Sequence, residues 1–316
     1  MKKIIAAAVL FAAISGAWAG YAGESAWREG AVIDIIPGGV PLAARAGFTV
    51  PIPEAPGRNT ESNKKAVIDY SNSQDGYVMI RYLERTSKQV KVIIEGPGGV
   101  SYTYNLRTDG EYDVFPLTAG DGSYSIGVFE QLEGTKYAAA SSAKITVALA
   151  DPFAPFIRPN QYVNFNRNSR TSGKAAELTL GVSGLTDIIA VVYNFVVENF
   201  SYDKQLAATV KSGYLPDVDA VLSREMGICF DYAAVMAAML RSLGIPTKLA
   251  VGYAGEVYHA WINAYSEETG WVNQVIFFDG KNWTLMDPTF ASSANQSPDV
   301  MRYIGDGSNY STKFVY

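Results

Sequence analysis

The alternation of apolar and polar residues divides this chain into a strand-rich part and a mixed part. Between residues 66 and 149, apolar side chains recur at every second position, as at Val90, Val92 and Ile94. This is the period of a half-buried β-strand. Clusters of Gly, Pro and Asp separate the alternating runs, which is the turn chemistry of short strands. The stretch is therefore predicted to form a β-sandwich of immunoglobulin-like type.

A second pattern follows a proline-rich stretch, in which helical periods mix with strands. Thr186 is predicted to cap a helix that runs to about Phe200. The segment from Cys229 to Leu243 is apolar almost all round, which predicts a buried central helix. Gly244 after it supplies a stop signal. Strand-like runs are predicted at 247–253, 259–265, 271–278 and 283–287.

These patterns predict an α+β chain with five consecutive segments. They are an export signal (1–19), an extended Pro/Gly-rich arm (20–65), a β-sandwich domain (66–150), a linker (151–160) and a C-terminal α+β domain (161–316).

The first residues have the pattern of an export signal. A short basic start precedes the apolar run Ile4–Ile14, which is too short to span a bilayer, and Ala17 and Ala19 are small residues at cleavage-determining positions. A retained N-terminal membrane anchor is the alternative. No cysteine follows the apolar run, which argues against lipid attachment. We expect a secreted or extracytoplasmic protein with no stable membrane insertion after signal cleavage.

Composition narrows the classes of partner. The chain has 316 residues, which suggests about two domains, and its 48% hydrophobic and 18% charged residues are typical of globular proteins. A net charge of −5 argues against a large basic surface, so no nucleic-acid partner is expected. One cysteine and one histidine give no metal-ligand spacing, so neither a metal nor another cofactor is expected.

The single cysteine stands where the buried helix is predicted to begin. A helix N-terminus carries partial positive charge and unpaired N–H groups, which favour a thiolate. The same N–H groups can stabilise an oxyanion during acyl transfer. The alternative is a buried, inert cysteine, because cysteine is among the most buried residue types. Cys229 is therefore a candidate nucleophile, in an exported chain that cannot form an internal disulfide.

Two further residues complete a candidate constellation. His259 is the only imidazole of the chain and opens a strand-like run, in which Trp261 shares its face. Asp287 ends the last predicted strand, and the following Pro288 favours an extended conformation. A carboxylate there can accept the imidazole N–H and fix its tautomer. The alternatives are an ordinary structural histidine and a turn-initiating aspartate.

The residues around these three positions resemble the transglutaminase-like (papain-like) cysteine enzymes over roughly 185–290. The resemblance rests on Gly227–Ala233, Ala238–Thr247, Val251–Tyr253, His259–Trp261, Gly270–Trp271 and Asp287–Phe290. It implies a central cysteine helix packed on an antiparallel sheet, a catalytic domain at 161–316 and a Cys–His–Asp triad of Cys229, His259 and Asp287. Trp261 is a candidate substrate-binding residue of the groove.

This sequence departs from the family pattern after the histidine motif. An acidic residue often stands there in the family, whereas this chain has Ile262 and Asn263. Animal transglutaminases use calcium, but the resemblance here is to the generic core rather than to that subgroup.

The resemblance leaves three functions open. In the enzymatic versions, the cysteine attacks an amide carbonyl and the histidine protonates the departing amine. Attack by water on the thioester gives a protease or amidase, which we expect here because a secreted enzyme meets water more often than an aligned amine. Attack by an amine gives a transglutaminase, and a non-catalytic binding module is the third alternative. The expected substrate is an extracellular protein or a cell-wall peptide.

Overall fold

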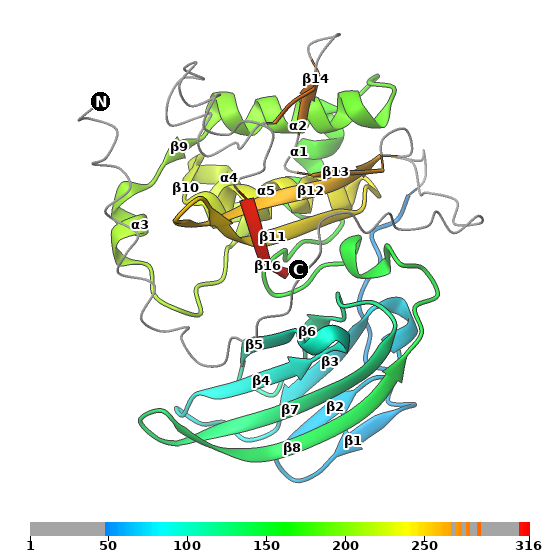
Figure 1. Ribbon diagram of the computed structural model, residues 1–316, viewed down its shortest axis with the longest axis vertical. Coiled ribbons are helices and arrows are strands. Elements are labelled where there is room, and N and C mark those ends of the chain that lie inside the picture. Colours follow the sequence, from blue (N-terminus) through cyan, green and yellow to red (C-terminus); the bar gives the residue numbers. More distant parts are fainter. Residues whose placement is uncertain (1–47, 267–269, 274–275, 279–282, 286–309) are drawn as a thin grey trace. The chain divides into compact units, whose positions relative to one another are not determined.

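The computed structural model describes residues 48–266, 270–273, 276–278, 283–285 and 310–316 (Figure 1). The described chain divides into two compact units. Residues 53–155 form the first, here called the β unit. Residues 48–52 and the described residues from Phe156 onward form the second, here called the C-terminal unit.

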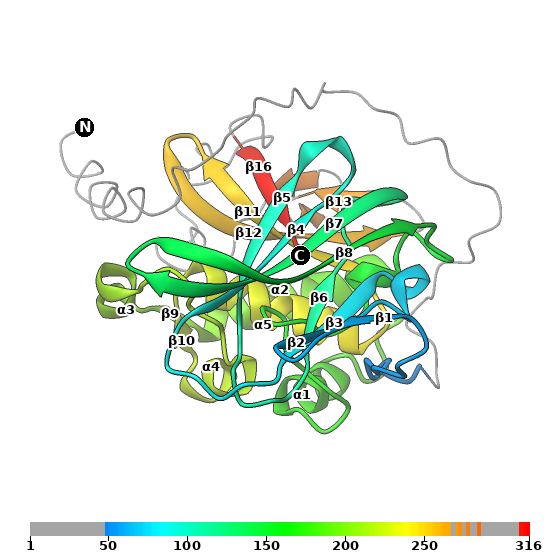
Figure 2. The same ribbon diagram turned by 90° about the horizontal axis from the view of Figure 1, so that it is seen from below.

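The β unit consists of two four-stranded antiparallel sheets (Figure 2). The first has the strand order β1 (Thr60–Ser62), β2 (Ala66–Asp69), β3 (Tyr77–Tyr82) and β6 (Asp113–Pro116). The second has the order β5 (Ser101–Leu106), β4 (Val90–Glu95), β7 (Gly122–Glu133) and β8 (Lys136–Val147). Single 3-10 turns lie at η2 (Ser73–Asp75), η3 (Pro97–Gly99) and η4 (Ala154–Phe156).

The apolar residues of the alternating pattern form the buried face of each sheet. On β4, Val90, Val92 and Ile94 are buried and Glu95 is exposed, so period two separates core from solvent. Strand β1 lies within the segment for which the sequence predicted an extended arm. It pairs with β2, but its three side chains are polar and exposed. The sequence therefore shows no apolar alternation that would predict this strand.

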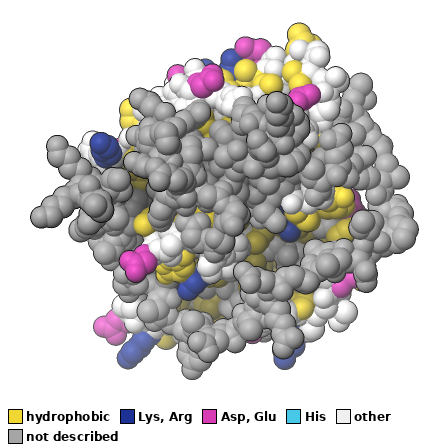
Figure 3. All heavy atoms as spheres, turned by 45° about the horizontal axis from the view of Figure 1, so that its top comes forward, with side chains coloured by type: hydrophobic (Ala, Val, Ile, Leu, Met, Phe, Trp, Pro, Cys, Tyr) yellow, Lys and Arg dark blue, Asp and Glu magenta, His cyan; other side chains and the backbone are white. Residues whose placement is uncertain are grey.

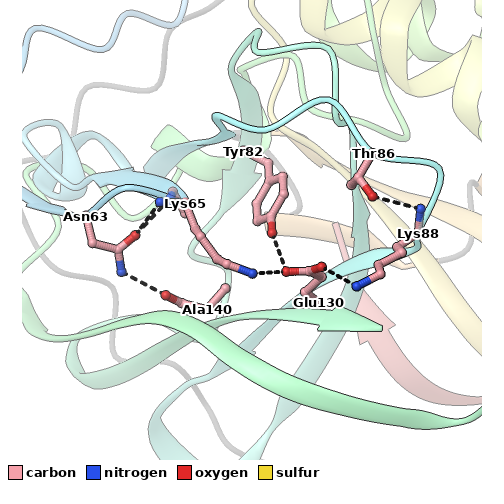
Figure 4. A network of polar contacts seen from close by, with 8 residues as sticks. Asn63, Lys65, Tyr82, Thr86, Lys88, Glu130 and Ala140 are labelled. Atoms are coloured by element: carbon pink, nitrogen blue, oxygen red, sulfur yellow. Dashed lines mark hydrogen bonds and ion pairs between the residues drawn. The ribbon is translucent and has the colours of Figure 1, made fainter. Parts of the chain in front are cut away.

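A buried carboxylate on β7 receives donors from the other sheet of the β unit (Figure 4). Glu130 accepts hydrogen bonds from Tyr82 of β3 at 2.7 Å and from Lys88 at 2.9 Å, and it also pairs with Lys65. The Lys65 and Lys88 hydrogen bonds and that of Tyr82 lower the pKa of Glu130 to about 2. The network therefore neutralises a charge that burial alone would make costly.

The C-terminal unit contains five helices among its described residues. They are α1 (Arg170–Leu178), α2 (Leu185–Asn199), α3 (Lys204–Thr209), α4 (Val218–Arg224) and α5 (Cys229–Ser242). None of the helices in the described part of the chain has the length and apolar composition needed to cross a bilayer.

Strands of this unit form a four-stranded antiparallel sheet and two short pairs. The sheet has the order β13 (Gly270–Asn273), β12 (Val257–Ser266), β11 (Thr247–Ala254) and β16 (Tyr310–Val315). The pairs are β9 (Ser201–Tyr202) with β10 (Met226–Gly227), which is parallel, and β14 (Ile276–Phe278) with β15 (Trp283–Leu285), which is antiparallel.

Helix α5 packs against β11 and β12 of the sheet and against α1, α2 and α4. Its residues from Cys229 to Arg241 are buried apart from Phe230, which confirms the prediction of a buried central helix. Gly244 follows it with φ +79, and a Cβ there would lie 2.9 Å from the Phe48 ring. The α+β class, with antiparallel sheets first and a helix-on-sheet core second, is confirmed.

The predicted start of α2 was wrong by two residues. Gly184, not Thr186, is the N-cap residue, and the helix begins at Leu185. Thr186 is the second residue of the helix, where its hydroxyl is buried rather than placed over the first turn. Glycine is itself tolerated at N-caps, and Gly184 has φ +102, a conformation that threonine adopts poorly.

Candidate active site

Cys229 is the first residue of α5 and is 6% exposed. The preceding Ile228 is in extended conformation, so the chain turns into the helix at the cysteine itself. Among the described residues it is the only cysteine, and its thiol is free. The thiol therefore lies at the start of a helix, where backbone N–H groups have no partner within the helix.

Asp231 fixes this turn, and the sequence analysis did not assign it a role. Its carboxylate accepts the Ile228 backbone N–H at 2.9 Å and the Tyr214 hydroxyl at 2.7 Å. The first contact is half of a capping box, in which the third residue of a helix bonds back to the N-cap. An acidic residue at that third position, three after the N-cap, was the available signal. Tyr214 lies before α4 and no local pattern links it to α5.

His259 is the third residue of β12 and is 4% exposed. It lies opposite Gly252 of β11 in the antiparallel register. The imidazole is near-parallel to the Trp261 ring, with centroids 6.3 Å apart, so both side chains lie on one face of the strand as predicted from period two. Trp261 is only 2% exposed, and its role in substrate binding stays a prediction.

Tyr310 is a neighbour of the imidazole that the sequence analysis missed. Its ring centroid lies 6.4 Å from that of His259 and 5.2 Å from that of Trp261. Tyr310 begins β16, which pairs with β11 across more than fifty intervening residues of sequence. No local sequence pattern indicates such a long-range pairing, which is seen only in the strand order of the sheet.

Helix α5, which begins at Cys229, packs against β12, the strand that carries His259. Burial raises the pKa of Tyr258 to about 12, with smaller contributions from the charges of Tyr253 and Cys229. Alternation along β12 directs the Tyr258 and His259 side chains to opposite faces.

Asp287, the third predicted residue, lies outside the described residues. The described strand β15 ends at Leu285, two positions before it, and pairs with β14. Its place in a triad therefore stays a prediction from the sequence.

The sequence comparison supports the fold seen here. Residues 172–288 match the profile of the Transglutaminase-like superfamily. The resemblance noted from the sequence motifs is confirmed.

Two curated proteins are similar to this transglutaminase-like segment. A protein-glutamine gamma-glutamyltransferase of Pseudomonas aeruginosa is 29% identical over 100 residues, which cover 27% of this chain and 14% of that protein. The uncharacterized protein YebA of Bacillus subtilis is 28% identical over 118 residues, which cover 31% of this chain and 16% of that protein. The chain thus matches less than a fifth of the length of either relative.

Two solved structures are similar to this chain at low TM-score and low sequence identity. A candidate cysteine protease from Cytophaga hutchinsonii has TM-score 0.38 at 15% identity, covering 74% of this chain and 73% of that one. Red sea bream transglutaminase has TM-score 0.26 at 12% identity, covering 72% and 53%.

Charged groups near the site do not form a metal-binding cluster within the described residues, where no group of three or more His, Cys, Asp or Glu side chains meets. On the face shown in Figure 3, basic and acidic side chains of the described residues are interspersed. The chemistry that the described site offers is that of a thiol and an imidazole on two packed elements.

Proposed function

We propose that the protein is a cysteine-dependent amide or peptide hydrolase that acts through Cys229, His259 and Asp287. The observation that carries the proposal is the position of Cys229, buried at the first residue of a helix that packs on the strand of the only histidine. The match of residues 172–288 to the Transglutaminase-like superfamily supports it.

The proposed reaction has two halves. The Cys229 thiolate attacks the amide carbonyl carbon, and the His259 imidazolium donates a proton to the departing amine nitrogen as the C–N bond breaks. Water then attacks the resulting thioester and gives a proton to His259 as the C–S bond breaks, so that the carboxylic acid leaves and the Cys229 thiolate and His259 imidazolium are restored. Asp287 accepts the second imidazole N–H and holds its tautomer. Backbone N–H groups at the start of α5 stabilise the oxyanion in both halves.

A second candidate is amine transfer, in which a lysine amine replaces water. It is favoured by the similarity to a curated protein-glutamine gamma-glutamyltransferase over 100 residues. Both reactions share the thioester, so they differ only in the nucleophile that resolves it.

The substrate and the location belong to the same proposal. An export signal at 1–19 would place the enzyme outside the cytoplasmic membrane, where extracellular proteins and cell-wall peptides are its substrates. Cell fractionation with an antibody tests the location: recovery of full-length chain in the cytoplasm would contradict export.

The decisive experiment is turnover on peptide and cell-wall fragment libraries. Wild-type protein should release amine, and Cys229→Ala should reduce kcat/KM by at least about 10³-fold. Met226→Ala, which alters an exposed side chain just before the helix, is the matched control and should keep its activity. Iodoacetamide should block the wild type, because the chain has one cysteine.

The products distinguish the alternatives. Acid product in the presence of excess primary amine supports hydrolysis, and efficient diversion to an amide product supports transfer. Absence of any thiol-dependent turnover would contradict both and favour a binding module. His259→Gln and Asp287→Asn should lower kcat/KM in the same assay if the triad is correct.

A further inference from the structure

A buried carboxylate lies in the same helical turn as the proposed nucleophile but takes no part in the proposed reaction. The Asp231 side chain is fully buried at the third position of α5. One carboxylate oxygen accepts the Ile228 N–H at 2.9 Å and the other accepts the Tyr214 hydroxyl at 2.7 Å. Both oxygens are therefore held, one by the backbone just before Cys229 and one by a distant side chain.

The backbone before the helix is shaped to this carboxylate. A Cβ at Gly227 would lie 2.6 Å from the Asp231 Cβ and 2.8 Å from one of its oxygens. Because Cβ atoms do not approach so closely, only glycine leaves room for the side chain. Gly227 belongs to β10, which pairs with β9. The turn is therefore held by a strand pair before it and by helix α5 after it.

The charges around Asp231 are of mixed sign. Burial raises the pKa of Asp231, while the Ile228 and Tyr214 hydrogen bonds and the positive charge of Arg224 act to lower it. The negative charge of Asp203, the N-cap residue of α3, acts to raise it. Above its raised pKa, Asp231 carries a negative charge in the first turn of α5.

A negative charge there has two opposite effects. It is favourable toward the partial positive charge of the helix N-terminus, so it stabilises the helix start. It is unfavourable toward a second negative charge nearby, so it disfavours a thiolate at Cys229. The Tyr214 hydroxyl, as a donor to the carboxylate, draws part of that charge away from the thiol.

We propose that Asp231 and Tyr214 are a positioning pair that fixes the 227–229 turn and sets the pH at which the Cys229 thiol becomes reactive. The proposal rests on the assignment of Cys229 as nucleophile. Both residues act through the cysteine, so they are positioning rather than catalytic residues.

The test is the pH dependence of Cys229 alkylation by iodoacetamide, which needs no substrate. Asp231→Asn keeps an acceptor for the Ile228 N–H but removes the charge, so the pH midpoint should fall by about one unit. Tyr214→Phe leaves the charge but removes a donor, so the midpoint should rise by about 0.3 unit. Opposite shifts from two contacting residues are not expected of a purely structural role.

Asp187→Asn is the matched control, because Asp187 is also the third residue of a helix, α2, but is exposed. Its midpoint should equal that of the wild type. An unchanged or raised midpoint in folded Asp231→Asn overturns the proposal. If Asp231→Asn fails to fold by circular dichroism, Tyr214→Phe decides alone, and an unchanged midpoint there overturns it.

The outcome is separable from that of the proposed function. Shifted midpoints in a protein without turnover contradict the hydrolase proposal and leave the positioning pair supported. Turnover with unshifted midpoints supports the hydrolase proposal and contradicts the positioning pair. Where turnover is measurable, the acidic limb of kcat/KM should move by the same amount as the alkylation midpoint.

Discussion

The two units bury charge in different ways. In the β unit, Glu130 receives two lysine ammonium groups and one tyrosine hydroxyl. In the C-terminal unit, Asp231 receives a tyrosine hydroxyl and a backbone amide, and Arg241 donates to main-chain oxygens of Thr247, Arg158 and Tyr316. Among the described residues, no ion pair within 4 Å joins Asp231 or Arg241 to another charged side chain.

This difference appears in the direction in which each pKa is shifted. The partners of Glu130 lower its pKa to about 2, whereas burial raises that of Asp231 and lowers those of Arg241 and Lys248 to about 9 and 8. Compensated charges favour the folded state, and uncompensated ones disfavour their own charged form.

The largest expected effect is that of removing Arg241. Its fully buried guanidinium donates to the carbonyls of Thr247, Arg158 and Tyr316 at 2.6–2.9 Å. Arg241→Met removes one buried donor from each of these three oxygens and should lower the free energy of unfolding by about 3–5 kcal/mol. The measurement is urea unfolding followed by tryptophan emission, which reports on this unit because residues 53–155 contain no tryptophan.

Two variants calibrate that measurement. Trp18→Phe with Trp27→Phe removes the tryptophans outside the described residues. In this background, Arg167→Met alters an exposed arginine and should change the unfolding free energy by less than about 0.5 kcal/mol. A loss for Arg241→Met that is no larger than this control would show that the buried guanidinium contributes no more than a surface one.

A smaller effect is expected at Lys248, whose ammonium lies 3.7 Å from the Trp271 ring centroid and 5.1 Å from that of Phe156. Burial lowers the pKa of Lys248 to about 8, so the folded state binds fewer protons than the unfolded state between about pH 8 and 10.4. Stability should therefore rise with pH in this window, by at most about 3 kcal/mol.

Lys248→Met should abolish this rise and retain the apolar contact with Trp271. The same group has an optical readout, since Trp271 emission should titrate with a midpoint near the pKa of about 8 in the wild type and not in the variant. A wild-type midpoint above pH 10 would mean that Lys248 is not desolvated. Lys248 would then no longer be an example of an uncompensated buried charge in the C-terminal unit.

Local patterns predicted what local physics determines. The start of α5 at Cys229, its stop at Gly244 and the strands that carry Val90 and His259 all followed from period and caps, because each depends on neighbours within a few residues. The prediction that Thr186 caps α2 was wrong, because Gly184, with φ +102, is the N-cap residue.

The remaining features depend on contacts that no window of sequence contains. Tyr214 reaches Asp231 across 17 positions, and Tyr310 reaches His259 through the pairing of β16 with β11. The three carbonyls that bind Arg241 come from segments up to 83 positions away. Such pairings are set by topology, so the sequence indicated the candidate cysteine and histidine but not the residues that contact them.

The smallest expected effect tests the compensated side of the comparison. Because the partners of Glu130 hold its pKa near 2, its stabilisation is present above about pH 4.5 and lost as pH falls toward 2. Lys65 and Lys88 are 42% and 48% exposed, so solvent screens both pairs, and Glu130→Gln should cost only about 1 kcal/mol at pH 7. Hydrogen exchange in β7 and β8 measures this loss, with exposed Glu133→Gln as control. If β7 exchange in Glu130→Gln matched that control, the three donors would not stabilise the β unit, and compensation of charge would not distinguish the two units.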